Sequence, residues 1–145
     1  MKHDRHLARE LVVQGLYEWL IAGNDARAIE HRLSEVKSFE KADRELLDQL
    51  LNGVIREAPQ LEARLAPFLD RKVSALSPVE RAVLLLGAYE LQHRPETPYR
   101  VVINEAVELA KSYGGTDGHK YVNGVLDRMA GELRSVEVRA GNLHR

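Results

Sequence analysis

The sequence predicts an all-α protein of about seven helices. Three observations favour this fold class. Apolar residues recur every three or four positions over most of the chain, no segment alternates between apolar and polar residues over a useful length, and Ala, Leu, Glu and Arg are abundant. The 145 residues are enough to bury a core, and a composition of 44% hydrophobic and 30% charged residues is typical of a folded globular protein.

The first two helices are predicted from apolar spacing and one turn. Apolar residues recur at intervals of three and four, which places them on one face of a helix of roughly five turns; they are Leu7, Leu11, Gly15/Leu16, Trp19 and Leu20. The polar cluster Gly23-Asn24-Asp25 ends this helix and caps a second one. We expect the second helix to end near Val36.

The third and fourth helices are separated by a proline. Leu46 to Ile55 form a broad apolar face of the kind that enters a helical bundle. Pro59 fits the first turn of a short fourth helix, because a proline is tolerated where the backbone N–H is unpaired. Pro67 is expected to disrupt the end of that helix.

The second half of the chain has sharper helix boundaries. Ser77-Pro78-Val79-Glu80 combines a capping residue, a proline at the first helical position and a glutamate three residues after the cap. A fifth helix therefore starts there and stops before Pro95. Thr97-Pro98 repeats the device and starts a sixth helix, which Gly114-Gly115 ends. Thr116 or Asp117 caps a seventh helix.

The chain is predicted to be a single domain over residues 1–145. We expect two small antiparallel helical bundles that share a core, at about 1–75 and 76–135. Residues 136–145 contain Gly141 and Asn142 and little apolar periodicity, which predicts a flexible tail.

Composition narrows the compartment and the kind of partner. The absence of cysteine excludes disulfides and Cys-based zinc sites and suits a reducing cytosol, while the polar start of the chain lacks the apolar core of a signal peptide. We therefore expect a cytoplasmic protein. Its net charge of −1 means that nucleic acid must be bound by a local patch. One candidate patch is the start, where Lys2, Arg5 and Arg9 outnumber Asp4.

The sequence indicates a protein that is not an enzyme and needs no cofactor or metal. It lacks a phosphate loop, a dinucleotide-binding glycine pattern and an HExxH zinc helix. An alternative is a small enzyme that uses His119 with Asp117 or Glu105 as an acid–base pair, but the sequence offers no second half of such a site.

A second candidate patch opens the predicted seventh helix. In residues 118–127, Lys120 and Tyr121 lie beside unpaired backbone N–H groups, so a phosphate could bind there while a base stacks on the tyrosine. The alternative is a solvated lysine and a core tyrosine. Phe68 beside Asp70-Arg71-Lys72 is another aromatic residue next to basic ones, with a core position as its alternative.

The start of the first helix has the same two interpretations. Arg5 and Arg9 are one helical turn apart and could bind successive phosphates, with Lys2 and a protonated His6 adding charge. A solvated helix start is the alternative.

Several segments together resemble the NusB family over nearly the whole chain. The segments are Ala8-Arg9-Glu10, Gln14-Gly15-Leu16-Tyr17, Ser77 to Leu84, Tyr89-Glu90-Leu91, Thr97 to Lys111 and His119 to Asp127. The resemblance is specific because asparagine, glycine and proline positions agree as well as the apolar pattern. It implies the NusB fold of two small helical bundles and a role in transcription antitermination.

The resemblance also implies partners and site residues. Family members pair with a NusE-like small-subunit ribosomal protein, and the pair binds boxA-type single-stranded RNA of ribosomal RNA operons within an elongation complex that contains other Nus factors. A homodimer is a further possibility in this family. The residues that would face RNA are Lys2, Arg5, His6, Arg9, Phe68, Lys120 and Tyr121, with Asp117 at the edge. Tyr17 and Glu80 would meet the NusE-like partner.

One departure from the family pattern affects RNA binding. Family members have a dense arginine cluster ahead of the Ala-Arg-Glu segment, whereas His6 and Leu7 occupy two of those places here and Asp4 adds a negative charge. Fewer cations should weaken RNA binding and flatten its salt dependence. The alternative function is a protein-interaction module with little RNA affinity of its own.

Overall fold

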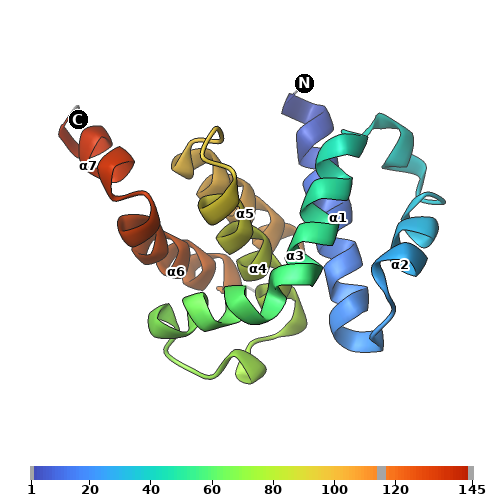
Figure 1. The fold of residues 1–145 in the computed structure, drawn as a ribbon, viewed down its shortest axis with the longest axis horizontal. Coiled ribbons are helices and arrows are strands. Elements are labelled where there is room, and N and C mark those ends of the chain that lie inside the picture. The colour runs from blue at the N-terminus through green and yellow to red at the C-terminus, as the bar shows by residue number, and fades with distance from the viewer. Residues whose placement is uncertain (1, 114–116, 144–145) are drawn as a thin grey trace.

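A computed structural model describes residues 2–113 and 117–143 of the chain, and all regular secondary structure in these ranges is helical (Figure 1). The fold class is therefore confirmed as all-α. The α-helices are α1 (Lys2–Ala22), α2 (Ala26–Leu33), α3 (Arg44–Leu65), α4 (Pro78–His93), α5 (Tyr99–Tyr113), α6 (Gly118–Leu133) and α7 (Ser135–Leu143). Three short 3-10 segments are η1 (Lys37–Lys41), η2 (Ala66–Phe68) and η3 (Val73–Ala75).

The helices α3, α4, α5 and α6 follow one another in alternating directions, as expected for antiparallel bundles. Helices α1 and α3 instead run the same way (Figure 1). Their starts are joined where the Asp43 backbone N donates to the Asp4 backbone O at 3.0 Å. This arrangement arises because α2 and η1 return the chain to the level at which α1 begins.

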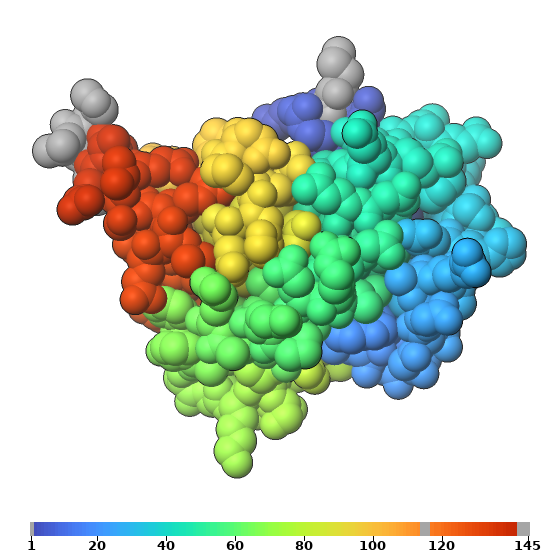
Figure 2. Space-filling view, viewed as in Figure 1, coloured from blue at the N-terminus to red at the C-terminus, as the bar shows by residue number. Residues whose placement is uncertain are grey.

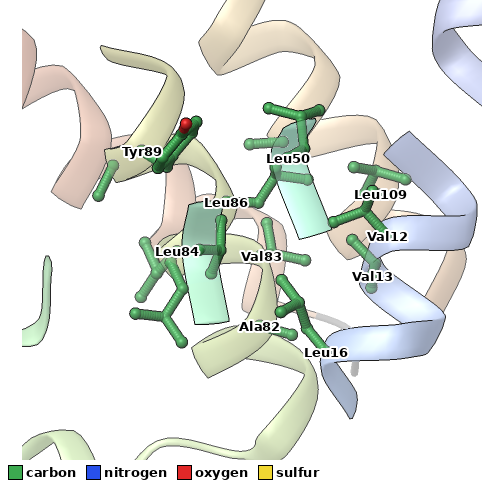
Figure 3. Close-up of a cluster of buried hydrophobic side chains, with 14 of the residues drawn as sticks. Val12, Val13, Leu16, Leu50, Ala82, Val83, Leu84, Leu86, Tyr89 and Leu109 are labelled. Carbon is green, nitrogen blue, oxygen red and sulfur yellow. The ribbon is translucent and has the colours of Figure 1, made fainter. Parts of the chain in front are cut away.

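Helix α4 is the centre of the fold, because it contacts α1, α3, α5 and α6. Its residues from Ala82 to Leu91 are all buried. Figure 3 shows the cluster formed by Ala82, Val83, Leu84, Leu86 and Tyr89 of α4 with Val12, Val13 and Leu16 of α1, Leu50 of α3 and Leu109 of α5. Buried apolar residues from both halves of the chain belong to this one core. A division into bundles at about 1–75 and 76–135 stays a prediction.

The prediction of a separate helix at Pro59 is wrong, because α3 runs through it without interruption. Pro59 is exposed, and the buried residues Ala58, Leu61 and Leu65 continue the apolar face on the other side of the helix. A proline inside a helix costs about 3 kcal/mol or more, and burying each leucine returns about 1.5–3 kcal/mol. Helix α3 accordingly bends in its second half instead of ending (Figure 1).

The sequence predicts a flexible tail from residue 136, whereas the structure has a helix there, α7, that extends to Leu143. Glu137 explains the difference. One carboxylate oxygen accepts from the Tyr99 backbone N at 2.8 Å, and the other accepts from Arg134 Nη1 at 2.7 Å. The first turn of α7 is thus tied to the start of α5.

Arg134, which follows α6, contacts the turn between α4 and α5. It is buried, and its guanidinium donates to four backbone carbonyls, those of Glu90, Leu91, Arg94 and Thr97. The carbonyls in the last turn of a helix lack partners within that helix. Arg134 therefore acts as a side-chain cap for the C-terminal end of α4.

Two predicted helix starts, at Asp25 and Ser77, have the predicted side-chain caps, whereas Asp117 precedes α6 without a side-chain cap hydrogen bond. Ser77 Oγ accepts from the Glu80 backbone N at 3.1 Å, and a Glu80 carboxylate oxygen accepts from the Ser77 backbone N at 3.2 Å, which completes a capping box. Asp25 caps α2 through the Ala28 backbone N. The predicted end of the sixth helix at Gly114-Gly115 and the cap at Thr116 lie outside the described residues.

Candidate nucleic-acid interface

The start of α1 forms one wall of a groove of about 420 Å³. Lys2 and Arg5, both exposed, line it together with Arg94, Glu96, Thr97, Pro98, Val101 and Glu105 from the α4–α5 turn and α5, and Arg9 lies at its base. We call this the α1 groove. Its rim carries cations that can approach a polyanion, as the sequence predicts for Lys2 and Arg5.

The family resemblance implies that Arg9 faces RNA, but in the structure its side chain does not face solvent. Its side chain is 4% exposed, and its guanidinium donates to both carboxylate oxygens of Glu90, at 2.9 and 2.8 Å. Burial is the largest single influence and lowers the pKa of Arg9, but the hydrogen bonds to Glu90 and the negative charges of Glu90, Glu105 and Asp43 together outweigh it, so the pKa is raised. The guanidinium is therefore permanently charged but paired with Glu90 inside the protein, so Arg9 does not present a cation at the surface.

His6 is held between two carboxylates. Its Nδ1 lies 2.7 Å from a Glu105 oxygen and its Nε2 lies 2.9 Å from a Glu10 oxygen. A neutral imidazole has one N–H, so only the protonated ring can donate to both. The hydrogen bond to Glu105 raises the pKa of His6 above its ordinary value, against the opposing effect of burial. His6 therefore neutralises a carboxylate at the wall of the α1 groove.

A second cluster lies where the segment after α3 meets α6, and Figure 2 shows this light-green segment projecting from the lower edge of the molecule. Tyr121 is half-buried and packs against the core. Its hydroxyl accepts from the Asp70 backbone N at 3.3 Å, and the guanidinium carbon of Arg71 lies 4.5 Å from the ring centroid. We call Phe68, Asp70, Arg71, Tyr121 and Arg128 the Tyr121 platform.

Phe68 has a mainly structural position. Its side chain is half-buried against the core, and its backbone carbonyl accepts from Arg128 Nη2 at 2.8 Å. The sequence interpretation noted Arg71 only as a basic neighbour of Phe68, and it missed Arg128. A signal existed for Arg128, because it lies seven residues after Tyr121 and hence on the same face of α6.

Asp117 and Lys120 are the most exposed of the predicted RNA-facing residues in α6 and its cap. Their side chains are 80% and 74% exposed, and Lys120 Nζ lies 3.5 Å from Asp117 Oδ1. Exposed pairs of this kind contribute about 0–1 kcal/mol, so the lysine can exchange this carboxylate for a phosphate at little cost. Asp117 moderates the positive charge there.

The predicted partner residue Tyr17 lines an apolar pocket of about 280 Å³ with Val13, Gln14, Val79 and Tyr113. We call this the Tyr17 pocket. The Tyr17 side chain is 43% exposed and Tyr113 is 38% exposed, which is unusual for large side chains that lie together. Glu80 does not line this pocket; it follows Val79, which does, and its carboxylate is engaged in the capping box.

The α1 groove, the Tyr17 pocket and the start of α6 follow one another on the surface. Helices α1 and α5 run side by side, with His6 beside Glu105 and Gln14 beside Tyr113, so the α1 groove leads into the Tyr17 pocket along the same seam. At the far end, Glu80 lies next to Gly118, where an added Cβ would be 3.5 Å from a Glu80 oxygen. The Tyr17 pocket therefore lies between the α1 groove and the start of α6.

The described residues contain no group of three His, Cys, Asp or Glu side chains suited to a metal ion, and no helix among them has the length and apolarity needed to span a bilayer. Glu105, considered above as a partner for His119, is bound to His6 instead.

These features define a small all-helical protein whose surface combines exposed cationic and aromatic residues with an apolar pocket. The chain belongs to the NusB family: residues 6–131 match the sequence model of that family.

Individual relatives cover almost all of the chain. It is 56% identical over 140 residues to the transcription antitermination protein NusB of Aromatoleum aromaticum, covering 97% of each protein, and 58% identical over 139 residues to that of Cupriavidus pinatubonensis, covering 96% of this chain and 83% of the relative.

Solved structures agree with the fold. A T. maritima NusB structure matches with a TM-score of 0.78 and 29% identity, over 88% of this chain and 91% of that one. A crystal structure of antitermination factors NusB and NusE in complex with double-stranded RNA matches with a TM-score of 0.76 and 25% identity, over 89% of this chain and 97% of that one.

Proposed function

We propose that this protein is a transcription antitermination factor that binds boxA-type single-stranded RNA of ribosomal RNA operons together with a NusE-like ribosomal protein. Its relatives carry the name transcription antitermination protein, and one structural neighbour is a NusB in complex with NusE and RNA. The protein acts by binding and makes or breaks no bond. It works in the cytoplasm, within an elongation complex that contains other Nus factors.

The observation that carries this proposal is the position of the Tyr17 pocket between the α1 groove and the start of α6. A partner bound at Tyr17 and Glu80 would lie within reach of RNA that passes from Lys2 and Arg5 towards Lys120. RNA could then contact both proteins at once. Sequence selectivity would arise from the pair, while this chain supplies phosphate contacts and base stacking.

A protein-interaction module with little RNA affinity is the second candidate. The observation that favours it is that two residues predicted to present positive charge to RNA are bound by carboxylates of the protein itself. Arg9 is buried against Glu90, and His6 is engaged by Glu10 and Glu105. Each phosphate contact that is lost lowers the slope of log affinity against log salt by about 0.7 for a single strand.

A salt-dependent titration separates the two candidates. A boxA-like single-stranded RNA and a scrambled control are titrated with the protein alone and with a NusE-like partner. The antitermination function predicts that the boxA-like RNA binds selectively, that this binding strengthens when the partner is present, and that it weakens in the Lys120→Ala variant. If the partner binds while neither RNA does at any salt concentration, the RNA assignment fails and the interaction module replaces it. A homodimer that hides the RNA surface would appear as concentration-dependent binding, which sedimentation measures.

A further inference from the structure

We propose that Arg71, and not the ring of Tyr121 itself, presents the stacking surface for a base of the bound single-stranded RNA. This inference rests on the proposed function, because it names the residue through which this chain would contact a base. It assigns Tyr121 a supporting role behind the guanidinium.

The first step is that the guanidinium of Arg71 lies over the ring of Tyr121. The guanidinium carbon of Arg71 lies 4.5 Å from the ring centroid, a cation–π contact, while the ring also packs against the core. A base that stacked directly on Tyr121 would have to displace Arg71 from this contact. The accessible surface at this point belongs to the arginine, whose side chain is 44% exposed.

The second step is the orientation of Arg71. Its Nε donates to Asp70 Oδ1 at 2.6 Å and its Nη2 donates to Oδ2 at 3.2 Å, a two-point arrangement that fixes the plane of the guanidinium. The hydrogen bond from Arg71 lowers the pKa of Asp70 to about 2, so the carboxylate stays charged and keeps its hold at neutral pH. The guanidinium is thus held as a flat platform before RNA arrives.

The third step is the support of the segment that carries Arg71. Two hydrogen bonds join this segment to α6: the Asp70 backbone N donates to Tyr121 Oη at 3.3 Å, and Arg128 Nη2 donates to the Phe68 carbonyl at 2.8 Å. These bonds hold the segment on both sides of Leu69, immediately before Arg71. A preorganised surface binds with a smaller loss of entropy than a mobile one.

The fourth step decides between a phosphate and a base as the ligand. A phosphate prefers the hydrogen-bonding edge of a guanidinium, but the Nε and Nη2 edge of Arg71 is occupied by the Asp70 carboxylate, which also repels anions. The Nη1 end of the guanidinium still carries N–H donors, but the negative charge of the neighbouring Asp70 carboxylate disfavours an anion there. The flat, weakly hydrated outer face instead suits a nucleobase.

The test compares variants that separate charge from planarity. Arg71→Lys keeps the charge and loses the plane, Arg71→Ala loses both, and Lys72→Ala is the matched control that removes the adjacent exposed cation. We expect Arg71→Lys and Arg71→Ala each to weaken binding of a boxA-like RNA about tenfold. Lys72→Ala should cost less and lower the salt slope by up to about one unit. Wild-type affinity in Arg71→Lys would overturn the proposal.

A second measurement keeps the test independent of folding. Single abasic nucleotides are placed along the RNA and titrated against the wild type and Arg71→Lys, with thermal melting of each protein as a check. One abasic position should weaken wild-type binding and cause no further loss in Arg71→Lys, because the stacked base is then already missing. Additive losses at every position would overturn the proposal. Failure of the wild type to bind any RNA would instead contradict the proposed function itself.

Discussion

Arg9 of α1 and Glu90 of α4, which are 81 positions apart, form a two-point ion pair inside the core. The side chains are 4% and 2% exposed, so neither charge is solvated by water. The pair joins the first helix to the central one at the end where α1 begins. An arginine that the family resemblance suggested for RNA is, in this fold, a structural residue.

Glu90→Ala should lower the free energy of unfolding by about 3–5 kcal/mol, because it leaves the Arg9 charge buried and unpaired. Urea denaturation followed by circular dichroism measures this loss. The double variant Arg9→Met, Glu90→Leu should recover most of it, since two apolar side chains of similar size leave no orphaned charge. A single variant that costs less than about 1 kcal/mol would show that the pair is dispensable.

His6 should make stability depend on pH near neutrality. Its pKa in the folded protein is raised above the value of 6.5 that applies to the unfolded chain, through the hydrogen bond to Glu105 and further contributions from Glu10. The stabilisation is therefore fully present below pH 6.5 and is lost as the pH rises through the folded pKa.

The check for His6 is the difference in unfolding free energy between the wild type and His6→Gln from about pH 5.5 to about pH 8.5. This difference should shrink towards alkaline pH. Titration of the ring protons by NMR gives the folded pKa directly, and a value at or below 6.5 would contradict the structural assignment. His3 is a useful internal control because it is exposed.

Gly53 should not tolerate a side chain. A Cβ added there would lie 2.4 Å from Tyr89 Oη, at the close approach of α3 and α4. Gly53→Ala should destabilise the protein by about 1–3 kcal/mol through overpacking. Gly131→Ala is the matched control within a helix, because nothing lies within 4 Å of its Cβ, and it should stabilise α6 by about 0.5–1 kcal/mol. Thermal denaturation of both variants measures these changes in stability.

Tyr17 should contribute to partner binding without contributing much to stability. Its side chain is 43% exposed at the Tyr17 pocket, so Tyr17→Ala should leave the melting temperature nearly unchanged. Loss of a tyrosine at the centre of an interface costs about 2 kcal/mol or more, which corresponds to at least a roughly thirtyfold weaker complex with a NusE-like protein. Calorimetry measures the affinity, and an unchanged value would place the partner elsewhere.

Local signals in the sequence predicted most of the helices. The capping box at Ser77 and the cap at Asp25 depend on residues three positions apart, and both appear in the structure. The 3.6-residue period likewise identified the faces that are buried. These features need only neighbouring residues to be recognised.

Features that depend on distant residues escaped the sequence interpretation. Arg9 looks like a surface cation until Glu90 is placed beside it, and α7 looks like a loose end until Glu137 meets the Tyr99 backbone. Pro59 was misread for a related reason, because the burial of Leu61 and Leu65 outweighs the local preference of a proline. The grouping of Asp70 and Arg71 against Tyr121 likewise requires the fold.

The pairing of α1 with α4 and α5 has a consequence for the order in which the protein is completed. Synthesis proceeds from the N-terminus, so α1 is the first helix to leave the ribosome. Arg9 and His6 can form their hydrogen bonds only after Glu90 and Glu105 have been synthesised, when most of the chain exists. Until then its cations stay exposed to any nearby polyanion, the ribosome included. Contact with Glu90 then withdraws Arg9 from such encounters and leaves Lys2 and Arg5 at the surface.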